Sequence, residues 1–171
     1  ITLTPVNDAP IRTGGTVTDL TVLEDSGLAG LGLEAVAYGP GGGTDESGQT
    51  LSYAVTTVPA SSTGDVFLAD GVTQVVVGAY TLAEIQGMQF RPAADGSGVT
   101  GFQFTVTDSG GTANGGSNSL SQLILITVTA VNEAAPVITS NGGGASAAIS
   151  VAENATAVTT VSATDADLPA A

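Results

Sequence analysis

The chain has 171 residues, of which 42% are apolar and 11% charged, and sixteen acidic residues against two basic ones give a net charge of −14. Cysteine, histidine, tryptophan and lysine are absent, which excludes Ser-His-Asp and Cys-His nucleophiles, thiolate or imidazole metal sites and lysine Schiff bases. The negative charge disfavours nucleic acid and anionic membrane surfaces, and no apolar run approaches the roughly 18 residues of a membrane helix. We therefore expect no enzyme, no nucleic-acid partner and no membrane insertion.

The remaining composition is typical of a β-rich domain with glycine turns, since Thr and Val are frequent beside 24 glycines and 7 prolines. In chain order, the predicted strands fall in residues 1–4, 15–23, 31–38, 51–56, 102–107 and 120–131. Only residues 81–86 favour a helix, because Thr81 can cap it and Glu84 follows three residues later. Short strands without long helices between them predict an all-β, immunoglobulin-like antiparallel sandwich.

The last two predicted strands give the clearest inward faces. Alternation is cleanest in residues 102–107, where the apolar positions are Phe102, Phe104 and Val106. In residues 120–131 the expected inward positions are Ile124, Ile126, Val128 and Ala130, with Leu123 and Leu125 on the opposite face. The glycine-rich residues 39–45 lack a following Lys-Ser/Thr, so we interpret them as an ordinary flexible loop.

Internal repetition indicates how the chain is organised. The segment Val-Asn-Asp-Ala-Pro at residues 6–10 recurs as Val-Asn-Glu-Ala-Ala-Pro at residues 131–136. Leu23-Glu24 and Ala152-Glu153 follow the two copies, and Thr44-Asp45 matches Thr164-Asp165, so matches recur in the same order at offsets of about 120–130 residues. We therefore predict residues 1–10 as the last strand and linker of one repeat, 11–133 as a complete repeat and 134–171 as the first strands of the next.

These residues resemble the cadherin-like repeats of large bacterial surface and secreted proteins. The resemblance covers Asn7-Asp8-Ala9-Pro10 as linker, Leu23-Glu24-Asp25 on the first strand, Thr44-Asp45-Glu46, Ala94-Asp95-Gly96 and Thr107-Asp108, with residues 80–85 and 90–94 in the bacterial pattern. It implies a cadherin-like sandwich, an extracellular or cell-surface location and Ca²⁺ sites at the repeat junctions. Ser47 stands where the family has a second Asp, so we expect one or two ions per junction.

The ligand chemistry points the same way, because Ca²⁺ takes six to eight hard oxygen ligands and the chain offers only oxygen ligands. If repeats stack end to end, the junction after the complete repeat should gather an intact site from Glu24, Asp95, Asn132, Glu133, Asp165 and Asp167. The junction before it should hold a partial site from Asn7, Asp8, Asp45 and Asp108. Carboxylates gathered without basic neighbours repel one another, so a divalent cation would convert each cluster into a clamp.

Three functions remain open from the sequence. The first is a calcium-stiffened spacer repeat of a long extracellular adhesin or fibre, acting in cell adhesion, biofilm or surface attachment, with neighbouring repeats as its partners. The second is a filament subunit that polymerises by β-strand exchange between copies, with residues 1–4 and the incomplete sandwich from Ile149 as complementary fragments. The third is a carbohydrate-binding module, which the scarcity of aromatic residues disfavours. We also expect the chain to be a segment of a longer protein.

Overall fold

The computed structural model describes residues 4–165, and the chain divides into two compact units, Ile1–Ala130 and Val131–Ala171. The first unit contains the long strands and the apolar core, whereas the described part of the second contains one short strand pair. Within the described residues, every helical segment is too short and too polar to cross a membrane.

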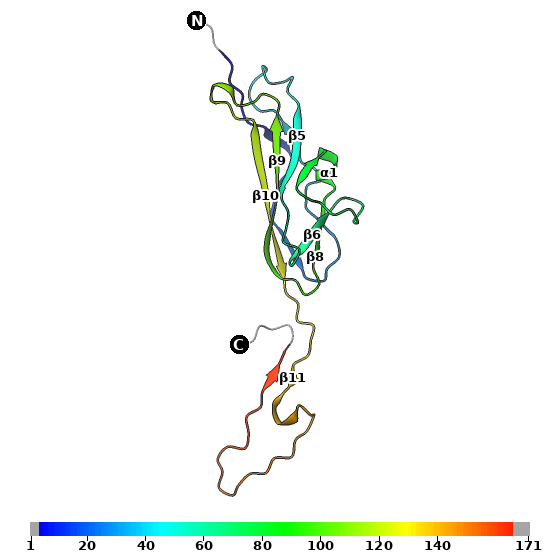
Figure 1. The fold of residues 1–171 in the computed structure, drawn as a ribbon, viewed down its shortest axis with the longest axis vertical. Coiled ribbons are helices and arrows are strands. Elements are labelled where there is room, and N and C mark those ends of the chain that lie inside the picture. The colour runs from blue at the N-terminus through cyan, green and yellow to red at the C-terminus, as the bar shows by residue number, and fades with distance from the viewer. Residues whose placement is uncertain (1–3, 166–171) are drawn as a thin grey trace. The chain divides into compact units, whose positions relative to one another are not determined.

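Two sheets enclose the core of the first unit (Figure 1). The larger sheet has five strands in the order β2-β10-β9-β5-β7, which are Leu20–Leu23, Ser119–Thr129, Gly98–Asp108, Leu51–Thr57 and Gly78–Tyr80. The smaller sheet has the order β3-β8-β6, which are Ala29–Gly30, Gln89–Pro92 and Gly64–Phe67. Strands β1 (Ile11–Gly14) and β4 (Ala37–Gly39) form a separate antiparallel pair.

The strand order is that of an immunoglobulin-like sandwich. In chain order, β3, β5, β6, β8, β9 and β10 take the places of the B, C, D, E, F and G strands, because one sheet then reads G-F-C and the other B-E-D. The predicted all-β sandwich is therefore confirmed. Its pairs are antiparallel except for β2, which runs parallel to β10 with Leu20 opposite Ile126 and Leu23 opposite Thr129.

Alternation along β9 and β10 builds most of the core. Phe102, Phe104 and Val106 are fully buried, as are Ile124 and Ile126 on the neighbouring strand. The opposite face of β10 is open, as predicted, with Leu123 half exposed at 50%. The prediction for Ala130 was wrong, because β10 ends at Thr129 and Ala130 is exposed beyond the last pair.

The predicted helix is confirmed as α1, Leu82–Gln86. Thr81 caps it by accepting the Glu84 N–H at 3.2 Å, and the Glu84 carboxylate accepts the Thr81 N–H at 2.7 Å. The Thr81 N–H and then the Thr81 hydroxyl, which donates to the same carboxylate at 2.8 Å, hold the pKa of Glu84 below its ordinary value. Ile85 is the buried residue of the helix and fixes it against the core.

Two predicted strands are shorter than the sequence suggests. Residues 15–19 lie in no strand, since Gly15 turns the chain at φ 65° close to the backbone of Ala35. Residues 31–36 are also outside the strands, yet Leu31, Leu33 and Val36 are buried. Their apolar spacing therefore reflects a core-lining connection between β3 and β4.

The second unit is sparsely paired. Strand β11 (Val137–Ile138) pairs with β12 (Ala163–Thr164), and a single 3-10 turn spans Ser140–Gly142. Apolar side chains are open to solvent, with Val137 at 60% exposure and Val161 at 67%. The strand predicted at residues 1–4 falls largely outside the described residues, and Thr4 lies in no strand.

Candidate metal centre

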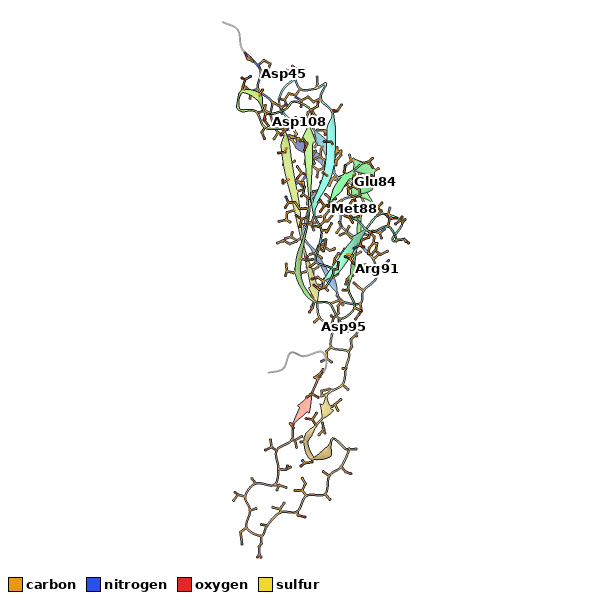
Figure 2. The ribbon with its side chains drawn as sticks, viewed as in Figure 1. Asp45, Glu84, Met88, Arg91, Asp95 and Asp108 are labelled. Carbon is orange, nitrogen blue, oxygen red and sulfur yellow. The ribbon has the colours of Figure 1, made fainter. Side chains whose placement is uncertain are left out.

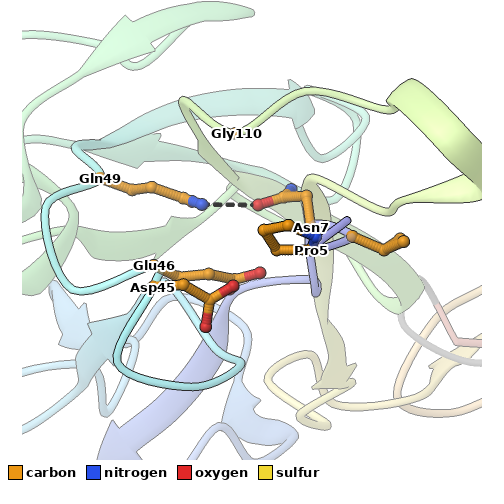
Figure 3. Close-up of a pocket in the computed structure, with 7 residues that line it drawn as sticks. Pro5, Asn7, Asp45, Glu46, Gln49 and Gly110 are labelled. Carbon is orange, nitrogen blue, oxygen red and sulfur yellow. Dashed lines mark hydrogen bonds between the residues drawn. The ribbon is translucent and has the colours of Figure 1, made fainter. Parts of the chain in front are cut away.

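Acidic residues of the first unit gather at both ends of the sandwich. Asp45 and Asp108 lie near one end and Asp95 near the other (Figure 2). We call the first of these ends the N-terminal pole, defined by Asn7, Asp45, Glu46, Gln49 and Asp108. A shallow pocket opens there, lined by Pro5, Val6, Asn7, Asp45, Glu46, Gln49 and Gly110 (Figure 3).

Asn7 joins the linker to the rest of the pole. Its Nδ2 donates to Asp108 Oδ1 at 2.9 Å and to two backbone carbonyls of the β9–β10 connection, Gly111 at 3.0 Å and Ser117 at 2.7 Å. Its Oδ1 accepts from Gln49 Nε2 at 2.7 Å, which Figure 3 shows as a dashed line. The predicted residues Asn7 and Asp108 are thus in direct contact.

Glu46 carries the most enclosed carboxylate of the pole, with the residue only 3% exposed. Its Oε1 accepts the backbone N–H of Asp8 at 2.6 Å. Its Oε2 is buried and has no hydrogen-bond partner among the described residues. A buried carboxylate oxygen is stable only when it is paired, hydrogen-bonded or bound to a metal, so this atom is a candidate ligand for a cation.

Asp108 presents a second oxygen of the same kind. The residue ends β9 with its side chain turned inward and is 4% exposed. Oδ1 accepts from Asn7 Nδ2 and from the Gly110 N–H, both at 2.9 Å, whereas the buried Oδ2 has no hydrogen-bond partner among the described residues. In each buried carboxylate, one oxygen therefore accepts hydrogen bonds from the protein, and the other has no hydrogen-bond partner among the described residues.

Glycines make this close packing sterically feasible. A Cβ on Gly42, whose φ is 53°, would overlap the Glu46 carboxylate, and one on Gly110 would overlap the Asn7 side-chain amide. The glycine-rich loop interpreted from the sequence as an ordinary connection thus encloses Glu46 and contacts the linker carbonyl of Ala9. Because its glycines have no Cβ, the loop can pack directly against the Glu46 carboxylate and bury it.

The remaining predicted residues of the pole are more exposed. The Asp45 side chain lines the pocket beside Glu46, and Asp8 contributes its N–H to Glu46 while its own side chain faces solvent. Asn7, Asp8, Asp45 and Asp108 therefore lie in one region of the structure; that they hold an ion there stays a prediction. Glu46 and Gln49 are not among the candidate site residues predicted from the sequence. The position of Glu46 next to Asp45 could have indicated it, but the burial of Glu46 depends on the glycine loop.

At the opposite end of the first unit, Glu24 and Asp95 come from the end of β2 and from the turn after β8. Glu24 is 8% exposed, and its N–H donates to the carbonyl of Thr129 at 3.0 Å. Asp25 and Asp95 both have positive φ angles, 57° and 53°, and a carboxylate oxygen of each lies within 4.8 Å of the other. Asp25 is not among the ligands predicted from the sequence.

The other residues predicted for the second junction belong to the second unit. Asn132 and Glu133 are exposed at its start, and Asp165 is half-buried after β12. Asp167 lies outside the described residues. The assembly of Glu24, Asp95, Asn132, Glu133, Asp165 and Asp167 into one site stays a prediction.

The donor atoms of the N-terminal pole are of the type that a hard cation binds. Carboxylate and carbonyl oxygens are the ligands of Ca²⁺, which accepts irregular sets of six to eight. The pole offers the two unpartnered oxygens of Glu46 and Asp108 together with the Asp45 carboxylate. The nearby Gln49 Nε2 donates to Asn7 Oδ1, and no hydrogen bond from it to Glu46 Oε2 or Asp108 Oδ2 is formed.

Comparison with known proteins finds matches among solved structures. No protein-family model matches the chain, and no curated protein matches it. Eight chains of solved structures match, among them the crystal structure of human CDH23 EC21-23, with 17% sequence identity and a TM-score of 0.47 over 95% of this chain and 47% of that one. The chain spans about half the length of that solved chain. The immunoglobulin-like architecture therefore rests on the strand order described above.

Proposed function

We propose that the first unit is a calcium-binding structural repeat of a long extracellular adhesin or fibre, with an ion held at the N-terminal pole. The observation that carries the proposal is the pair of buried carboxylates, Glu46 and Asp108, each with one oxygen hydrogen-bonded and one without a partner. Enclosing such oxygens without a cation costs several kcal/mol per charge. A bound Ca²⁺ offsets that cost and uses the same oxygens as ligands.

The ion would act as a structural tie. Its ligands come from segments far apart in the sequence, since Asp45 and Glu46 follow the glycine loop, Asp108 ends β9, and Asp8 donates to Glu46 from the linker. Binding would fix these segments relative to one another and stiffen the linker that enters the sandwich. A protein made of such repeats would act as a spacer that holds other parts away from a surface.

The affinity range of extracellular calcium modules suits this role. Such modules bind at about 10⁻⁴–10⁻³ M, which fills them outside a cell and empties them inside. Secretion in a loose form followed by stiffening outside the cell is the expected sequence of events. The second junction is part of the same proposal, with neighbouring repeats as partners and Glu24, Asp95, Asn132, Glu133, Asp165 and Asp167 as ligands.

Calorimetric titration with CaCl₂ tests the proposal directly. We expect the wild type to bind, Asp108→Asn to lose the pole site, and the control Asp65→Asn to bind like the wild type, because the Asp65 side chain on β6 accepts from the Ser61 hydroxyl and does not line the pocket of the pole. The Asp165→Ala/Asp167→Ala double variant tests the second junction separately. Binding to the native state should stabilise it by about 2.7 kcal/mol at a hundredfold excess over Kd. A wild type with no heat and an unchanged melting temperature rejects the proposal.

A second candidate function is a filament subunit that polymerises by β-strand exchange. The second unit favours it, because only four of its described residues are paired in strands while Ile149, Val151 and Val158 are exposed at 40%, 44% and 66%. Alternating apolar residues of this kind are suited to addition to a sheet edge. Sedimentation that finds only monomer at high protein concentration, with and without calcium, contradicts this function.

A further inference from the structure

Both the nitrogen and the oxygen of the Asn7 side-chain amide form hydrogen bonds within the protein. Its two N–H hydrogens are shared among Asp108 Oδ1 and the carbonyls of Gly111 and Ser117, at 2.7–3.0 Å, and its oxygen accepts from Gln49 at 2.7 Å. The sequence predicts Asn7 as an ion ligand. Its amide oxygen accepts from Gln49 and its amide nitrogen donates to Asp108 and the β9–β10 connection, so the contacts observed at the pole are those of a residue that fixes other groups.

The backbone around Asn7 is held in the same way. The Ser117 N–H donates to the Asn7 carbonyl at 2.9 Å, and the Asp8 N–H donates to Glu46 at 2.6 Å. The linker is thus hydrogen-bonded to the β9–β10 connection on one side and to the segment before β5 on the other. All of these contacts join protein atoms, so the arrangement needs no ion to satisfy its donors.

Asn7 also sets the orientation of Asp108. Because Oδ1 accepts from Asn7 Nδ2 and from the Gly110 N–H, the carboxylate is held with only Oδ2 unused. Gly110 is required for this approach, since a Cβ there would overlap the Asn7 amide. The group that fixes the linker therefore also determines which carboxylate oxygen is left for a ligand.

We propose that Asn7 is the positioning residue of the N-terminal pole, which fastens the linker and orients Asp108 before an ion arrives. The part of this inference that concerns the ion rests on the proposed function; the part that concerns the linker does not. A site preformed in this way loses less conformational freedom on binding. The linker of this repeat should accordingly be ordered even in the presence of a chelator.

Hydrogen exchange of the Asp8 and Ser117 amides tests the inference, because each donates to an atom of this network. The variant Asn7→Asp keeps the shape of the side chain but replaces its NH₂ donor with a carboxylate oxygen. That oxygen then faces three acceptors, which are Asp108 Oδ1 and the carbonyls of Gly111 and Ser117. In a chelator we expect both amides to exchange at least about tenfold faster than in the wild type, as for the loss of hydrogen bonds to buried groups. In saturating calcium the cation takes the place of the lost donor, and protection should return.

Asn114→Asp is the matched control, since it makes the same charge change in the β9–β10 connection that Asn7 contacts, at a residue whose φ of 55° Asp also tolerates. Its exchange in chelator should stay within about twofold of the wild type. Unchanged protection of the core amides of Phe104 and Ile124 shows that a variant is folded. If Asn7→Asp does not fold, Gln49→Met, which removes only the donor to Asn7 Oδ1, should give a smaller increase in the same two amides.

Two results overturn the inference: wild-type amides protected only when calcium is present, or Asn7→Asp amides that exchange like the wild type in chelator. Failure of the proposed function looks different. A wild type that binds no calcium by calorimetry rejects the ion site, while the comparison of wild type and Asn7→Asp in chelator still decides whether Asn7 fastens the linker.

Discussion

Replacing Glu46 with Gln should move the stability of the ion-free and ion-bound forms in opposite directions. The Gln side-chain oxygen keeps the hydrogen bond from the Asp8 N–H, which Glu46 accepts at 2.6 Å. The other oxygen, buried and without a hydrogen-bond partner in the described chain, becomes an uncharged NH₂ group beside the remaining acidic side chains. The variant therefore changes the charge of the pole and little of its shape.

The magnitude follows from the burial of that oxygen. A buried polar atom without a partner costs about 1–3 kcal/mol, and more when it is charged, so in chelator Glu46→Gln should be more stable than the wild type by about 1–3 kcal/mol. With calcium at a hundredfold excess over Kd the wild type gains about 2.7 kcal/mol, whereas the variant lacks a charged ligand and gains little. In calcium the wild type should therefore equal or exceed the variant.

Thermal unfolding in chelator and in calcium measures both effects, with about 4 °C of melting temperature for each kcal/mol in a domain of this size. Glu34→Gln is the control, because Glu34 is exposed in the connection between β3 and β4 and the same charge change there should leave the calcium effect intact. A Glu46→Gln protein that is destabilised in chelator, and still stabilised by calcium like the wild type, would refute the assignment of Glu46 as a buried ligand.

Three further substitutions test the packing and the helix cap. Gly42→Ala places a Cβ against a buried carboxylate at φ 53° and should cost at least about 1–2 kcal/mol by urea unfolding, whereas Gly48→Ala, with nothing within 4 Å of its Cβ, should cost less. Phe104→Ala removes a fully buried ring and should cost about 3–5 kcal/mol, measured the same way. Because the folded-state pKa of Glu84 is lowered by Thr81, its contribution is present above the unfolded pKa and lost as pH falls through the folded one. Glu84→Gln should therefore reduce the difference in melting temperature between neutral pH and about pH 3.

The sequence was informative wherever one residue's neighbours in the chain determine its environment. Alternation in residues 102–107 and at Ile124, Ile126 and Val128 identified the core faces of β9 and β10, and Thr81 with Glu84 identified the helix. These features depend on periodicity and local capping, which a sequence displays directly.

Features that depend on distant segments could not be predicted in this way. The burial of Glu46 requires a glycine loop to fold over it and the linker N–H to reach it, and the engagement of Asn7 requires Gln49, Asp108 and two carbonyls beyond β9. Residue type alone made Asn7 a ligand and left Glu46 aside. Contacts across about 40 and 100 residues of sequence are the basis on which we propose the reverse for these two residues.

The parallel pairing of β2 with β10 determines how the sandwich resists a pulling force. Tension applied at the linker and at the end of β10 would draw the two strands in opposite directions along their own axes, so that the pairs from Leu20–Ile126 to Leu23–Thr129 are loaded together in shear. Antiparallel β1–β4 is short and would open first, one pair after another. A tether built from such units would lengthen slightly at low load and then hold until a whole strand slips.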